Sequence, residues 1–79
     1  MKTKFTERQG QYLAFIYNYT KMNGRPPAES DMEYYFRVTP PTVHQMVLNL
    51  EKKGLISRIP RKPRSIQLLV LPDELPRLK

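Results

Sequence analysis

Amide, hydroxyl and imidazole side chains recur at short intervals between residues 42 and 49 of the sequence. With Val43 taken as a core position, the helical period places Gln45 opposite the core and Thr42, His44 and Asn49 on the flanks. A glutamine can bond both N6 and N7 of adenine, and a threonine methyl can contact the methyl of thymine. Side chains of these types are able to recognise base edges, and the same pattern, with Gln45 and Asn49 as ordinary solvated residues, also fits an exposed helix face without a ligand. The apolar stripe of the helix expected over residues 40–53 is Val43, Met46, Val47 and Leu50.

Catalysis and metal binding receive little support from the sequence. It has no cysteine and a single histidine, His44, with no companions at metal-ligand spacing. It has no glycine-rich phosphate loop, and none of its serines has an evident base beside it. We therefore expect no enzyme, no metal and no other cofactor, and no small-molecule ligand is evident.

The formal net charge of the whole chain is +7, and basic residues are concentrated in its second half. Residues 52–64 contain six basic side chains and no acidic one, which predicts a polyanionic partner. A solvated surface that only keeps the protein in solution would show the same composition. A membrane surface would require basic residues opposite an apolar helix face, whereas these fall mostly on a predicted strand and loop.

Capping signals and apolar spacing predict three helices. A capping box opens the first, expected over residues 7–23. The second is short and ends near Phe36; its start is ambiguous between Ser30, the head of another capping box, and Ala28, which the preceding double proline permits. The third is expected over residues 40–53, with Thr39 as its N-cap and Gly54 and Leu55 forming a Schellman ending.

After the third helix the hydrophobic period changes from helical to alternating, which predicts a β-hairpin. Its strands are expected over residues 55–59 and 65–70, joined by a basic loop with two prolines at 60–64. Alternate residues of the second strand are expected to face the helices. Residues 72–79 are expected to form an extended tail behind a domain of residues 1–71.

Two helices joined by a short turn and followed by a basic hairpin describe a winged helix-turn-helix, an α+β fold that is mainly α. A helix fits the major groove of DNA, and the hairpin brings cations to the backbone or minor groove. The aromatic residues all lie at or before Phe36, whereas single-strand binders stack bases on sheet aromatics. Two hypotheses follow: a sequence-specific regulator of double-stranded DNA, or a protein-interaction module whose basic face serves solubility.

Several segments resemble the N-terminal DNA-binding domain of the LexA repressors. The resemblance covers roughly residues 5–70 and implies a repressor that reads its operator with the first turns of helix 40–53, while the wing contacts the backbone. The base-reading residues are then Thr39, Pro41, Thr42, His44 and Gln45, with Asn49 added from its flanking position. The segments are Phe5–Gln9, Gly24–Pro27, Pro41–Val43, Leu50–Ile56 and Arg64–Leu68.

The resemblance also implies contacts with the DNA backbone. It assigns phosphate contacts to Arg8, Lys52 and Lys53. Because the loop of the wing is basic, we expect it to contact the DNA backbone as well. Two departures stand out. We expect no autoproteolysis, because the self-cleaving protease domain of complete LexA repressors does not follow in these 79 residues. We also expect Arg37, where such turns often have glycine, to be left-handed. The wing residues expected to contact DNA are Arg61, Lys62 and Arg64.

Double-stranded DNA is the expected partner, and a homodimer is compatible with it because one small module buries little surface on DNA. No membrane partner is expected, since the longest apolar run, Tyr12 to Tyr17, is far below the roughly 20 residues that span a bilayer. The absence of cysteine, and a basic start with no apolar stretch after it, predict a cytoplasmic protein without a signal peptide.

Overall fold

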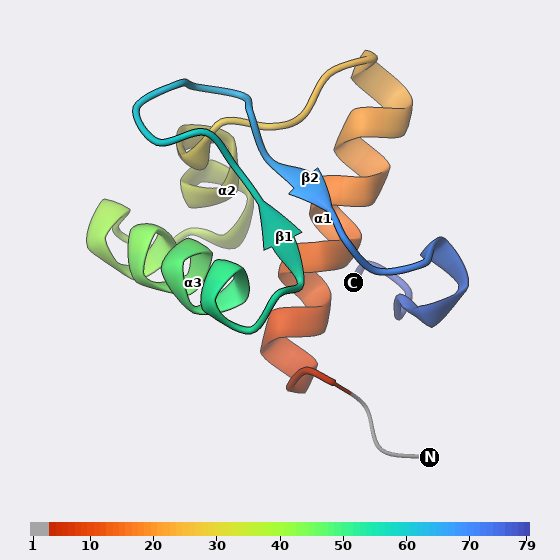
Figure 1. Ribbon diagram of the computed structural model, residues 1–79. Helices are drawn as coiled ribbons and strands as arrows, with labels where there is room; N and C mark the ends of the chain where they lie inside the picture. Colours follow the sequence, from red (N-terminus) through yellow and green to blue (C-terminus); the bar gives the residue numbers. More distant parts are fainter. Residues whose placement is uncertain (1–3) are drawn as a thin grey trace.

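The computed structural model describes residues 4–79, which form three helices and a small antiparallel hairpin (Figure 1). The predicted winged helix-turn-helix is confirmed. Residues 1–3 lie outside the described range. The predicted domain begins with these residues, and they are also part of the basic start for which no signal peptide is expected. The elements are α1 (Glu7–Asn23), α2 (Glu29–Phe36), α3 (Pro40–Lys52), β1 (Ile56–Ser57), β2 (Gln67–Leu68) and a short 3-10 helix, η1 (Pro72–Glu74).

Local hydrogen bonds explain where the first two helices begin. The hydroxyl of Thr6 accepts from the backbone of Gln9 at 3.1 Å, and the Gln9 side chain accepts from the backbone of Thr6 at 3.0 Å. This is the predicted capping box, and α1 has the predicted bounds. In α2 the carboxylate of Asp31 accepts from the backbone of Ala28 at 2.8 Å, which selects Ala28 rather than Ser30 as the N-cap.

The ends of α3 are set by backbone geometry. Thr39 is the N-cap, but its hydroxyl lies 2.9 Å from that of Thr42 and does not cap a backbone amide. At the other end, the backbone of Leu55 donates to Leu50 and that of Gly54 to Glu51, both at 3.0 Å. These two bonds form the predicted Schellman motif, with Gly54 left-handed at φ 75°. The helix ends at Lys52, one residue before the predicted end.

The apolar core lies between the three helices and the hairpin. Tyr12 of α1 stacks on Phe36 of α2 with ring centroids 4.1 Å apart, and Val47 of α3 is fully buried. Ile66 is buried and Leu68 packs against the core, so alternate residues of the second strand face the helices as predicted. Each large side chain buried in this way contributes roughly 1.5–3 kcal/mol.

The hairpin is shorter than predicted. Its ladder pairs Ile56 with Leu68 and Ser57 with Gln67, so each strand has two residues rather than the five or six expected. At the loop end the side chain of Ser65 replaces a strand pair, since its hydroxyl accepts from the backbone of Ile59 at 3.0 Å. The same hydroxyl donates to the Lys62 carbonyl at 2.8 Å, which closes the loop.

The sequence predicted an extended tail over residues 72–79. Instead, these residues include the short helix η1 and fold back onto α1 (Figure 1). The amide of Gln11 donates to the carbonyl of Arg77, and its oxygen accepts from the backbone of Lys79, both at 2.8 Å. A Cβ at Gly10 would lie 3.1 Å from Cγ of Pro76, so glycine permits this close approach. The tail also packs its apolar side chains, Leu75 and Leu78, against the core.

Arg37 ends α2 in the left-handed conformation predicted for it, with φ 55° and ψ 51°. Replacing Arg37 with glycine should raise the free energy of unfolding by about 1 kcal/mol, because an L side chain is strained there and glycine is not. Urea denaturation followed by circular dichroism measures the difference. Arg37→Ala is the matched control, since it removes the side chain but keeps the strain. Equal stability of the two variants would show that backbone strain is not the cause.

Candidate nucleic-acid interface

The side chains predicted to read bases lie on the outer surface of α3 or at its N-terminus. All six are exposed, whereas Val43 and Val47 of the same helix are fully buried. The predicted helical register is therefore the observed one. Their contacts with bases stay a prediction. The six are Thr39, Pro41, Thr42, His44, Gln45 and Asn49.

Besides Thr39 and Thr42, whose hydroxyls contact each other, three of these residues make side-chain hydrogen bonds that orient them. Nε2 of Gln45 donates to the side-chain oxygen of Asn49 at 3.2 Å, one helical turn further along. Nδ1 of His44 lies 3.2 Å and 3.3 Å from the two carboxylate oxygens of Glu29, in the first turn of α2. Both pairs hold a polar side chain in a definite position before any ligand is present.

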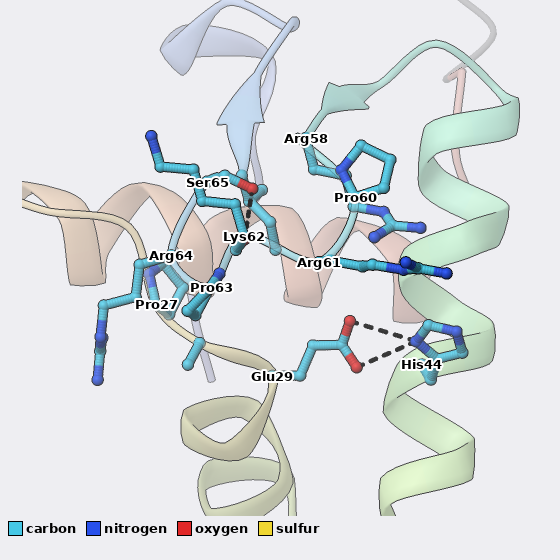
Figure 2. A pocket seen from close by; sticks show the side chains of 12 residues that line it. Pro27, Glu29, His44, Arg58, Pro60, Arg61, Lys62, Pro63, Arg64 and Ser65 are labelled. Carbon is cyan, nitrogen blue, oxygen red and sulfur yellow. Dashed lines mark hydrogen bonds and ion pairs between the residues drawn. The ribbon is translucent and has the colours of Figure 1, made fainter.

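A groove separates the N-terminal half of α3 and the start of α2 from the wing loop, residues 58–66 (Figure 2). It has a volume of about 540 Å³, and its walls carry several cations and one carboxylate. Figure 2 shows Arg61 extending from the wing towards α3, on the same side as the pair formed by Glu29 and His44. The ionisable residues that line it are Glu29, His44, Arg58, Arg61, Lys62 and Arg64.

Arg64 differs from its predicted role at the tip of the wing. Its Nη1 lies 3.0 Å from Oδ2 of Asp31, and donates to the Tyr19 hydroxyl at 3.1 Å and to the Pro26 carbonyl at 3.3 Å. The hydrogen bond with Tyr19 and the charge of Asp31 raise the pKa of Arg64, while desolvation opposes them. Arg64 therefore ties the wing to α1 and α2.

The remaining predicted cations fall into two groups. Arg61 and Lys62 are exposed on the wing beside the groove, and their contacts with DNA stay a prediction. Arg8, Lys52 and Lys53 do not line the groove. The Arg8 guanidinium lies 5.3 Å from the ring centroid of Phe36, and Nζ of Lys53 donates to Gln9 at 2.9 Å. Lys52 is exposed near the end of α3.

Sequence reasoning missed the residues that hold this surface in place. Glu29, Asp31 and Tyr19 were given no role at this surface from the sequence. Arg58, which pairs with Glu51 at 3.2 Å and is 17% exposed, was counted only as part of the basic run. A partial signal existed for Asp31, because an acid at the third helical position often caps the backbone.

Two further classes of site find no support in the part of the chain that the structure describes. Residues 4–79 contain no group of three or more His, Cys, Asp or Glu placed to hold a metal ion. Among the same residues, no helix has the length and apolar character needed to cross a membrane.

Comparison with known proteins agrees with this geometry. The model of a family described as the LexA DNA binding domain matches residues 2–65. Proteins named LexA repressor are similar to the chain: that of Thermosipho melanesiensis is 46% identical over 66 residues, and that of Thermosipho africanus 43% over 70. The alignments cover 84% and 89% of this chain but 33% and 35% of those proteins, so the chain spans about a third of their length.

Arg64→Lys should lower the melting temperature and loosen the wing, because lysine lacks the planar, rigid guanidinium that Arg64 places between Tyr19, Pro26 and Asp31. Thermal unfolding measures the first effect, and faster amide exchange at residues 58–66 measures the second. The control is Arg61→Lys, at an exposed wing position where the same change should leave both readouts unaltered. An Arg64→Lys protein with wild-type exchange in the wing would contradict the assignment.

Proposed function

The chain belongs to the family of LexA DNA-binding domains, and we propose from this premise that it binds double-stranded DNA sequence-specifically and represses transcription by occupying an operator. The observation that carries the proposal is the juxtaposition of two surfaces. His44, on the exposed polar face of α3, lies across a groove from the cationic wing. A helix of this diameter enters the major groove, while the wing meets the adjacent backbone.

Gln45 is suited to reading an adenine. Its Nε2 carries two hydrogens, of which Asn49 accepts one, so the second remains for N7 of adenine while Oε1 accepts from N6. Asn49 thus holds the amide in the orientation that a bidentate contact requires. Thr42, also exposed on the first turns of α3, supplies a methyl group for thymine.

Phosphate binding in this proposal rests on exposed cations. Arg61 and Lys62 reach the backbone or minor groove from the wing, and Lys52 reaches it from the end of α3. Arg8 and Lys53 add charge beside the start of α1. Arg64 is left out of the contact set, because its guanidinium is already engaged by Asp31 and Tyr19.

The proposal extends to assembly and location. One module of this size buries little DNA surface, so two copies on paired half-sites provide the affinity that a repressor needs. The site of action is the cytoplasm, where the DNA is. In this proposal the domain acts by occupancy and has no catalytic role, cofactor or small-molecule ligand of its own.

Duplex affinity should fall steeply with salt. Contacts with about six phosphates predict a slope of log affinity against log salt of about −5. Arg61→Ala should reduce the slope by about 1 and weaken all duplexes alike. Fluorescence anisotropy measures both. Arg77→Ala, an exposed tail position that loses the same charge, is the control. A salt-independent affinity, or no duplex binding at all, would contradict the proposed function.

Gln45→Ala should relax base preference at one position of the site, by about 1–3 kcal/mol of discrimination, because the bidentate contact is lost. Selection of bound duplexes from a random pool reveals the preferred site and its symmetry for the wild-type and variant proteins. Gln67→Ala, exposed on β2, is the control and should leave the preference unchanged. If Gln45→Ala weakened every duplex equally, the assignment of α3 as the reading helix in this register would fail.

A further inference from the structure

The imidazole of His44 is held by a carboxylate from a different helix. Nδ1 of His44, in the second turn of α3, lies 3.2 Å and 3.3 Å from the two oxygens of Glu29 at the start of α2. Figure 2 shows the two side chains facing each other at the groove. The His44 side chain is nevertheless 55% exposed. One edge of the ring is therefore fixed while the other remains accessible.

This contact determines which ring nitrogen carries the hydrogen. An ionised carboxylate only accepts hydrogen bonds, so Nδ1 must be the donor. In the neutral imidazole Nε2 is then bare and can only accept. Within residues 4–79, Nε2 makes no hydrogen bond. The surface of α3 thus presents an acceptor at a place where the other tautomer would present a donor.

An exposed acceptor on this helix discriminates between bases. In the major groove the exocyclic amines of adenine and cytosine are donors, whereas guanine and thymine present acceptors at the corresponding edge. We propose that Glu29 is a positioning residue for specificity: it fixes the tautomer of His44 so that Nε2 accepts from an adenine or cytosine amine. The inference rests on the proposed function, since it concerns how α3 reads DNA.

Other groups lining the groove do not compete for this role. Arg58 is held by Glu51 through its Nε, and Arg64 by Asp31. Arg61 and Lys62 are donors only, so neither can take the hydrogen of Nδ1. Glu29 is the one carboxylate on the groove wall among the described residues. Its removal therefore leaves the His44 tautomer free to exchange.

Ring-nitrogen NMR tests the tautomer without DNA. His44 is the only histidine, so its signals in a ¹⁵N–¹H multiple-bond spectrum of the full chain in alkaline buffer need no assignment by mutation. The wild-type protein should carry the hydrogen on Nδ1. Glu29→Gln keeps the side-chain shape, but its amide can donate as well as accept, so the hydrogen should shift towards Nε2. A wild-type hydrogen on Nε2, or a tautomer unaffected by Glu29→Gln, overturns the inference.

Duplex selection tests the consequence for recognition. His44→Ala first identifies the base pair that His44 reads, as the position where preference disappears. At that position Glu29→Gln should reduce the preference for adenine or cytosine over guanine or thymine about three- to ten-fold, the value of one hydrogen bond. Loss of a negative charge will also strengthen binding to every duplex. Glu33→Gln, the same charge change on α2 away from the groove, supplies that uniform effect alone.

The two measurements separate the possible failures. If no variant and no wild-type protein binds any duplex, the proposed function fails, and the reading role of His44 fails with it. If duplexes bind but Glu29→Gln and Glu33→Gln change affinity by the same factor for every base, the proposed function stands and the positioning role of Glu29 is overturned. A selective loss of preference in Glu29→Gln together with the tautomer shift supports the inference.

Discussion

The guanidinium of Arg64 joins three parts of the chain that are distant in sequence: the wing, the end of α1 and the start of α2. Its partners are Tyr19, Pro26 and Asp31, at 3.0–3.3 Å. The backbone of Arg64 is itself left-handed, at φ 57°, a conformation that costs a non-glycine residue about 1 kcal/mol or more. Despite this cost, the bonds of the side chain hold the wing loop against α1 and α2.

The basic residues of this domain divide into two kinds by what they contact. Arg58 and Arg64 are partly buried and form ion pairs with acids of the same domain, Glu51 and Asp31 respectively. Arg61 and Lys62, on the same loop, are exposed. A composition rich in Lys and Arg therefore overstates the charge available to a partner. The paired cations shape the surface on which the unpaired ones are presented.

How far the sequence predicted this structure depends on the range of each interaction. The bounds of α1 and the end of α3 follow from contacts within a few residues, and both were predicted to within one residue. The inward turn of Arg64 depends on Asp31, 33 positions away, and the orientation of His44 depends on Glu29 in another helix. No local pattern encodes such pairs. The exposed face of α3 was predicted because helical periodicity alone determines it, whereas its base contacts stay a prediction.

The returning tail makes the last residues part of the folded unit. Gln11 bonds to the backbone of Arg77 and Lys79, and the hydroxyl of Tyr35 donates to the Lys79 carbonyl. None of these residues lines the groove. A fluorophore or surface anchor attached at Lys79 would therefore leave the α3 face open, whereas cutting the chain after η1 would remove the polar partners of Gln11 in the second turn of α1.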